Sequence, residues 1–374
     1  MSYIFLASGW LLSLILGVII VPKILFISHK KHLYDLPDIR KMHNMPIPRL
    51  GGLSFFPVIL ISVCFVLGVR YFFGFPIENL PQGDLLCQFL FFAVGSMILY
   101  LVGAADDLVG VGYRHKFLAQ IIAALLLVWG GEWINSLGGL FGIYMLPVYI
   151  GIPITLFIVV FITNAINLLD GIDGLASGLC CCVLVILGCM CFVQGEYIFA
   201  LLAFATFGVV IPFWVYNVFG NANRGQKLFM GDTGSLILGY IISFLVIHLS
   251  NFGMPESVTG RNINLLLAFS TLIVPLFDVV RVVLHRLRHK KNPFLPDKNH
   301  IHHKLIRTGL RIRQVMIYIL LLALSFIVLN RVMIEYMNIT IVLLIDIAIW
   351  VAMHFAINKY IKNKESKKIL RQTV

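Results

Sequence analysis

The chain has 374 residues, of which 60% are hydrophobic and only 12% charged, and its mean hydropathy is +0.94. This composition excludes a soluble globular enzyme, because a soluble domain cannot bury so much apolar surface, whereas a bundle of membrane helices can. The formal net charge is +12. It does not predict a nucleic-acid partner, because the basic residues are distributed as membrane orientation requires.

A helix needs about 20 mainly apolar residues to cross a bilayer. The sequence contains eleven apolar segments that are candidates for such spans. The first has no basic residues before it, so we expect a retained span rather than a cleaved signal peptide. The fourth, sixth and tenth are short. The eleven predicted spans cover approximately residues 3–26, 51–73, 85–105, 117–129, 147–169, 178–193, 197–219, 235–252, 263–284, 315–330 and 338–356.

The basic residues predict the orientation of these spans. If the N-terminus is outside, only Arg70, Arg261 and Arg331 of the 29 Lys and Arg residues lie on the outer side. Because Lys and Arg concentrate in cytoplasmic loops, we expect an outer N-terminus and a cytoplasmic C-terminus. The predicted fold is therefore an all-α polytopic membrane protein with one domain over residues 1–357 and a basic cytoplasmic tail over 358–374. Its inner loops are 28–50, 106–116, 170–177, 220–234 and 285–314.

Five of the 17 acidic residues lie in three short motifs, each at the predicted inner end of a span. A charge in the hydrocarbon core costs roughly 2.5–3.5 kcal/mol on insertion scales, so acids beside it usually have a function. Gathered acids predict a divalent cation and a phosphorylated substrate at the membrane surface. Each motif taken alone is also compatible with a helix cap or a turn. The residues are Asp106 and Asp107 in GAADD, Asp170 and Asp173 in NAINLLDGIDGLASG, and Asp232 in FMGDTGS.

Two of these motifs contain further candidates. Asn164 and Asn167 precede Asp170 and Asp173 at intervals of three residues, which places the four on a slowly turning helix face. In FMGDTGS, Phe229 offers an aromatic surface on which a base can stack.

A basic inner loop, RLRHKKNPFLPDKNHIHHKLIR at 286–307, carries a histidine cluster at positions 300, 302 and 303. These side chains are suited to zinc, but we favour donors to phosphate oxygens, because Lys and Arg surround them and no Cys or acidic ligand is close. A solvated basic loop is the alternative.

Other acids belong to no motif. We expect Asp278 to pair with Arg281 three residues later, and Asp346 has no explanation from sequence. Six acids of the outer loops are expected to be solvated: Glu78, Asp84, Glu132, Glu196, Glu256 and Glu335.

Taken together, the motifs resemble those of the polyprenyl-phosphate N-acetylhexosamine-1-phosphate transferases, and most nearly the bacterial undecaprenyl-phosphate GlcNAc-1-phosphate transferases. The resemblance rests on five motifs in order between about residues 30 and 310. They are RKMHNMPIPRLGG, the Asp pair, NAINLLDGIDGLA, FMGDTGS and PFLPDKNHIHH. It implies a bacterial inner-membrane enzyme with a cytoplasmic active site. Such an enzyme transfers a sugar-1-phosphate from a UDP-sugar to undecaprenyl phosphate and releases UMP.

The resemblance also implies roles for individual residues. Asp232 and Asn167 would hold Mg²⁺, with Mn²⁺ as an alternative. Asp106 would deprotonate or orient the lipid phosphate, and Asp107 would assist. The implied substrate-binding residues are Lys116, Asn164, Asp170, Asp173, Phe229, Arg286, His300, His302 and His303. Membrane lipids are further partners, and a homodimer is plausible for the superfamily.

The chain departs from the family in two places. The segment YNVFGNANRGQKLFMGD at 216–232 is longer than the usual linker and lacks its proline, which leaves the role of Asn217 open. The HIHH run differs from the three consecutive histidines of phospho-MurNAc-pentapeptide transferases, which favours a simple HexNAc donor. That transferase remains the alternative enzyme, and a secondary transporter of an anionic solute is an alternative of another class.

Overall fold

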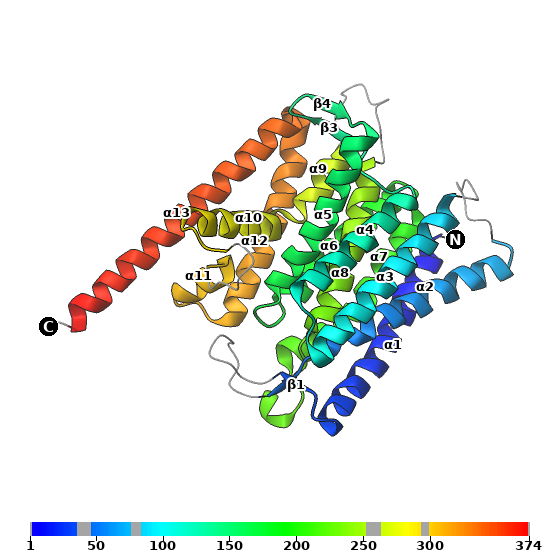
Figure 1. Cartoon of the computed structure of the whole chain (residues 1–374), viewed down its shortest axis with the longest axis horizontal. Coiled ribbons are helices and arrows are strands. Elements are labelled where there is room, and N and C mark those ends of the chain that lie inside the picture. Colours follow the sequence, from blue (N-terminus) through cyan, green and yellow to red (C-terminus); the bar gives the residue numbers. More distant parts are fainter. Residues whose placement is uncertain (1, 36–45, 76–83, 252–262, 293–298, 373–374) are drawn as a thin grey trace.

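A computed structural model describes residues 2–35, 46–75, 84–251, 263–292 and 299–372, in which helices predominate (Figure 1). The first half contains α1 (Ser2–Lys30), β1 (Tyr34–Asp35), β2 (Ile47–Pro48), η1 (Gly51–Ser54), α2 (Phe55–Phe72), α3 (Asp84–Val109), α4 (Tyr113–Trp129), β3 (Ser136–Leu140), β4 (Ile143–Met145) and α5 (Val148–Leu169). The second half contains α6 (Leu175–Val193), α7 (Tyr197–Phe219), η2 (Ala222–Arg224), α8 (Gly231–Asn251), α9 (Ile263–Ser270), α10 (Ile273–Arg288), α11 (Ile301–Arg307), α12 (Ile312–Tyr336) and α13 (Ile339–Gln372).

Nine of the described helices are long and apolar enough to cross a membrane, and α9 with α10 makes a tenth if the pair counts as one span. This confirms a polytopic all-α membrane protein. The remaining predicted span corresponds to α4, which has 17 residues, the lower end of the range for spanning helices. The two short hairpins, β1–β2 and β3–β4, are antiparallel and lie at opposite ends of the bundle (Figure 1).

Helix α8 is the centre of the bundle. Of its apolar stretch, 94% is buried, compared with 28% for α1. It packs against α3 on one side and α5 on another, and it lies among the other helices in Figure 1. Small residues help to explain this position, because Gly239 lets α8 approach α5 so closely that a Cβ there would lie 2.6 Å from the Cα of Thr163. The residues at its two ends are therefore held by the core.

The ninth predicted span is not one continuous helix. Its first part, α9, ends at Ser270, and α10 leaves at an angle of 67° after a two-residue break. The Thr271 hydroxyl satisfies a carbonyl that the break deprives of its helical partner, since the Leu272 amide donates to Phe269 and Thr271 Oγ1 donates to the Ala268 carbonyl instead. The bend turns α10 across the bundle towards α11 (Figure 1).

Several predicted boundaries shift. Helix α3 continues to Val109 and α8 begins at Gly231, so Asp106, Asp107 and Asp232 lie on helices rather than in loops. Helix α13 runs without interruption past residue 357, where the sequence predicted a tail, and projects from the bundle (Figure 1).

The prediction that the outer acids are solvated is wrong for Glu132. Its side chain is buried and lies 2.8 Å from His248 Nδ1, because α8 brings that histidine to the end of α4. Glu196 lies on the other side of the same ring, at 3.5 Å from Nε2. Glu335 is exposed and paired with Arg331, whereas Glu78, Glu256 and the side chain of Asp84 lie outside the described residues.

Candidate active site

Three carboxylates converge at one end of the bundle. Asp106 and Asp107 lie near the end of α3, and Asp232 lies in the first turn of α8. One oxygen from each comes within 4.8 Å of the others. Within the described part of the chain, no other group of three His, Cys, Asp or Glu side chains meets this geometry. The structure therefore brings together the three residues that the sequence predicted to be catalytic.

Glycines allow this convergence. A Cβ atom at Gly103 would lie 2.5 Å from the Cα of Thr233, so only glycine lets α3 approach the first turn of α8 so closely. A Cβ at Gly52 would collide with the backbone of Gly234. The Gly52 amide also donates to the Met230 carbonyl at 2.8 Å. The first turn of α8 is thus packed directly between the backbones of α3 and η1.

Asp107 holds the start of α8. Its Oδ1 accepts the Asp232 amide at 2.8 Å, and its Oδ2 accepts the amide and the hydroxyl of Thr233 at 2.9 and 2.6 Å. A carboxylate at this point satisfies helix amides that have no partner within the helix. The Asp107 side chain is fully buried. Its acceptor capacity is mostly used, which marks it as a positioning group more than a metal ligand.

Two cations face the three carboxylates. Arg49 approaches all of them, with its guanidinium nitrogens 2.8 Å from Asp232, 3.2 Å from Asp107 and 3.6 Å from Asp106. Lys116, in the first turn of α4, lies 2.6 Å from Asp232 and 3.3 Å from Asp106. Three negative groups against two positive ones leave an excess negative charge in a partly buried site.

Asp170 lies beside this cluster. It ends α5, and burial together with the nearby carboxylates of Asp232 and Asp107 raises its pKa well above the usual range of an aspartate. The direction of this shift favours the protonated form of Asp170, so its carboxyl group adds little negative charge while no cation is bound. A divalent cation bound by the neighbouring carboxylates would favour its ionised form.

The asparagines of α5 divide into two groups. Asn167 reaches the cluster, with its amide nitrogen 3.2 Å from Asp232 Oδ1 and 2.8 Å from Ser235 Oγ. Asn164 lies one turn further into the bundle and donates to Gln120 of α4 at 2.6 Å. The structure thus places Asn167 in the site and Asn164 behind it.

The loop that follows α5 is joined to the segment before α8. Asp173 pairs with Lys227. Asn217, buried at the end of α7, accepts the Gly174 amide at 2.6 Å and donates to the Leu228 carbonyl at 2.8 Å. Phe229 is half-buried next to this junction, and its backbone is hydrogen-bonded to Pro48 and Gly51. Asn217 therefore has a structural role despite the unusual linker.

The histidine cluster adjoins the same loop. His302 is 1% exposed, and a Cβ at Gly171 would lie 2.9 Å from its Nε2. Burial lowers the pKa of His302 to about 3, and neither ring nitrogen has a hydrogen-bond partner within the described chain. The rings of His300 and His303 flank it, with centroids at 5.8 and 4.2 Å. Arg286 is buried in the last turn of α10.

Some site residues were not predicted. Arg49 was not singled out, because basic residues are ordinary in cytoplasmic loops and its partner Asp232 is 183 positions away. Its place between Pro48 and the Gly51–Gly52 pair was the available signal. Lys227 gave no comparable signal, since it lies in the segment that departs from the family.

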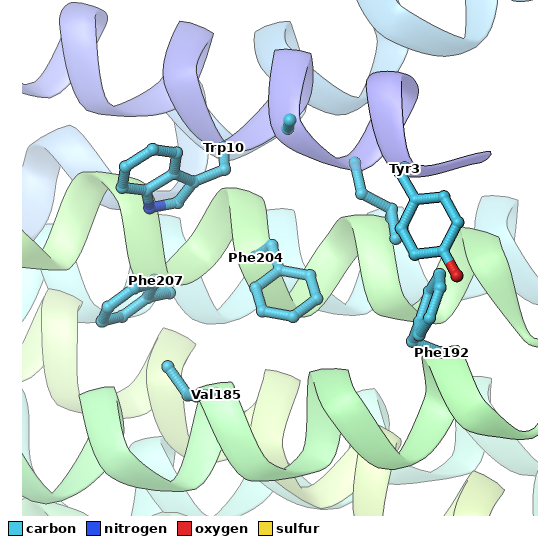
Figure 2. A pocket seen from close by; sticks show the side chains of 8 residues that line it. Tyr3, Trp10, Val185, Phe192, Phe204 and Phe207 are labelled. Carbon is cyan, nitrogen blue, oxygen red and sulfur yellow. The ribbon is translucent and has the colours of Figure 1, made fainter. Parts of the chain in front are cut away.

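A separate cavity of about 380 Å³ lies between α1, α6 and α7 (Figure 2). The labelled side chains that face it are apolar or aromatic: Tyr3, Trp10, Val185, Phe192, Phe204 and Phe207. It offers no charged or metal-ligating side chain, so it is not a candidate for the reaction.

Comparison with known proteins identifies the family of this chain. The model of glycosyl transferase family 4 matches residues 89–250. The chain is 30% identical over 301 residues to the undecaprenyl-phosphate alpha-N-acetylglucosaminyl 1-phosphate transferase of Escherichia coli (strain K12), covering 79% of this chain and 75% of that protein. It is 32% identical over 319 residues to the probable undecaprenyl-phosphate N-acetylglucosaminyl 1-phosphate transferase of Bacillus subtilis (strain 168), covering 85% and 82%.

The length and level of these matches establish the relationship. The chain belongs to the polyprenyl-phosphate N-acetylhexosamine-1-phosphate transferases of glycosyl transferase family 4.

Proposed function

We propose that this protein transfers a sugar-1-phosphate from a UDP-sugar to undecaprenyl phosphate, with release of UMP. GlcNAc-1-phosphate is the group we favour, because the similar proteins named above are GlcNAc-1-phosphate transferases. The observation that carries the proposal is the cluster of Asp106, Asp107 and Asp232 with Arg49 and Lys116 at the end of a membrane bundle. The product would begin a lipid-linked cell-surface glycan.

The donor set fits Mg²⁺. Oxygen ligands and an excess of negative charge are what this ion requires, and it usually takes only one or two carboxylates from the protein. Asp232 and Asn167 would hold it, since Asn167 can turn its amide oxygen towards the site. Asp106 lies beside them, whereas Asp107 is occupied with the start of α8. When bound, Mg²⁺ would neutralise charge on the diphosphate of the donor.

Asp106 is placed to act on the lipid phosphate. Its Oδ1 accepts the Val111 amide at 2.7 Å, so Oδ2 is the oxygen that can accept a proton or orient the nucleophile. Lys116 and Arg49 lie on the same side and would stabilise the charge that spreads over the transferred phosphoryl group. Phosphoryl transfer requires mainly this positioning and neutralisation.

The donor would extend away from the carboxylates. The loop of Asp170 and Asp173, together with Phe229, would bind the uridine. Arg286, His300, His302 and His303 would contact the sugar and diphosphate, and Asn164 would support Asn167 from behind through the α4–α5 contact. His302 supports this arrangement, because a buried ring with two unsatisfied nitrogens favours a polar ligand.

The reaction would take place on the cytoplasmic face of the bacterial inner membrane, where UDP-sugars are available. The distribution of Lys and Arg in the sequence supports this orientation. The prenyl tail would lie among the helices, and the basic part of α13 would face anionic lipid. A homodimer is part of the same proposal.

The test is UMP release by the purified protein in detergent, with undecaprenyl phosphate, Mg²⁺ and a panel of UDP-sugars. We expect turnover with a UDP-HexNAc, loss on chelation with EDTA and recovery with Mg²⁺ or Mn²⁺. Turnover with UDP-MurNAc-pentapeptide and with no UDP-HexNAc would identify the alternative transferase. A folded protein inactive with every donor that takes up anionic solutes in proteoliposomes would overturn the proposal.

A further inference from the structure

A buried acid outside the carboxylate cluster contacts the histidine segment. Asp278 of α10 is 1% exposed. Its Oδ2 lies 2.8 Å from His300 Nδ1, and its Oδ1 accepts the Arg281 guanidinium at 2.8 Å and the Ile301 amide at 3.0 Å. The predicted pair with Arg281 is confirmed, but it is only one of three contacts of this carboxylate.

These contacts hold three consecutive residues. Arg281 donates to the Asn299 carbonyl, while Asp278 binds His300 and the backbone of Ile301. Helix α11 begins at Ile301, so its first turn is fixed to α10 at its starting point. A helix of seven residues has little stability of its own, which makes such an external attachment necessary.

The Asp278 contact also sets the chemistry of the His300 ring. A carboxylate only accepts hydrogen bonds, so His300 Nδ1 carries the hydrogen, and Nε2 is the nitrogen that remains for a ligand. The ring planes of His300 and His302 are within 4° of parallel, and His302 lies against Gly171 in the loop after α5. A displacement of His300 would therefore reach the part of the site assigned to the donor.

We propose that Asp278 is a positioning residue for the transfer reaction, which orients His300 and the start of α11 for the sugar-diphosphate end of the donor. This inference rests on the proposed function, since it assigns the histidine segment to the donor. Asp278 touches no substrate and acts through His300. A buried ion pair with Arg281 that only stabilises the fold is the competing explanation.

The experiment compares full-length variants in detergent. The kcat and KM are measured separately for UDP-GlcNAc and undecaprenyl phosphate, per folded molecule, in Asp278→Asn, His300→Asn and the double variant. The matched control is Asp346→Asn, which changes another buried acid that is hydrogen-bonded to Asn330 of α12 at 2.8 Å. If the single Asp278 variant does not fold, Asp278→Glu and His300→Asn serve in its place.

We expect Asp278→Asn to lower kcat/KM for the donor by about 10–100-fold, the range for groups that orient a ligand side chain, with an unchanged KM for the lipid. The double variant should lose little more than His300→Asn alone, because Asp278 acts through that ring. The control should stay within about twofold of wild type. Additive losses, equal losses for both substrates, or wild-type donor kinetics in Asp278→Asn or His300→Asn would overturn the inference. Failure of the proposed function would already appear in the wild-type protein.

Discussion

The two ends of α8 both carry buried carboxylates, but they are built differently. At the end that begins with Gly231, the oxygens of Asp106, Asp107 and Asp232 converge within 4.8 Å of one another. At the other end, Glu132 and Glu196 lie on opposite nitrogens of His248, at 2.8 and 3.5 Å, and the ring stacks on Phe199 with a centroid distance of 3.4 Å.

The difference shows what identifies a reactive site. Carboxylates on either side of one imidazole are separated by the ring, so they join three segments but cannot share a ligand. Carboxylates whose oxygens converge, and whose negative charge exceeds the positive charge around them, can still bind a cation. Buried acids are therefore found at both ends of α8, whereas carboxylates that converge on one point are found, of these two ends, at the candidate active site.

The difference between the two ends of α8 can be tested by neutralising one acid at each end. We expect Asp232→Asn to lower kcat for UMP release by about 10³-fold, because the charge that holds Mg²⁺ is lost. Glu132→Gln makes the same chemical change at the His248 end and should keep turnover within about twofold. Wild-type turnover of Asp232→Asn would remove the metal assignment.

The next test concerns the cation between the acids. Arg49→Met should reduce kcat/KM by about 10²-fold, since the guanidinium contacts all three carboxylates at once. Arg49→Lys keeps the charge but not the fork of donors, and we expect it to recover only part of the activity, about tenfold below wild type. Full recovery by lysine would mean that charge alone matters here.

A smaller effect is expected from α13, which contacts α11 near its end. Lys304 donates to Asn358 at 2.9 Å, and Lys364 donates to the Thr308 carbonyl at 2.8 Å. Truncation after residue 357 should raise the donor KM by about fivefold, the equivalent of one hydrogen bond. Lys362→Ala removes a charge from an exposed position of α13 and serves as the control. If both variants behave alike, the tail acts through lipid rather than through α11.

The smallest effect on turnover should come from a change of His248 itself. His248→Gln leaves Glu132 buried beside a neutral side chain, so we expect a loss of about 3 kcal/mol in stability and a thermal midpoint lower by roughly 2–5 °C. Turnover at low temperature should remain within about twofold of wild type. A strong loss of kcat in a folded His248→Gln protein would contradict the conclusion that the His248 end of α8 is structural and the Asp232 end catalytic.

Sequence was sufficient for the parts of the site that lie beside apolar runs. Asp106, Asn167 and Asp232 are polar residues at the ends of hydrophobic segments, and such residues stand out because hydrocarbon penalises them. The same contrast revealed the membrane fold. Asn164 belonged to the same pattern, but a turn of helix separates it from the cluster, and only packing against Gln120 shows where it points.

Contacts between distant segments could not be predicted in this way. Arg49 lies in a region where basic residues are expected for membrane orientation alone. Nothing in the sequence therefore distinguished it from the other basic residues of that region. Glu132 follows a short helix and looked like a loop charge until α8 brought His248 to it. The break after Ser270 contains neither Gly nor Pro, and Pro275 lies beyond it in α10.

The backbone contacts at Gly52 and Gly103 limit how this enzyme can adapt. No side chain separates α8 from η1 or α3 at these points. The positions of these three backbones therefore cannot be adjusted by exchanging a larger residue for a smaller one. Changes in donor preference must therefore arise in the surrounding segments, such as 226–230 and 299–303, whose side chains can vary. A laboratory selection for new donors would be expected to enrich substitutions there and to leave the two glycines unchanged.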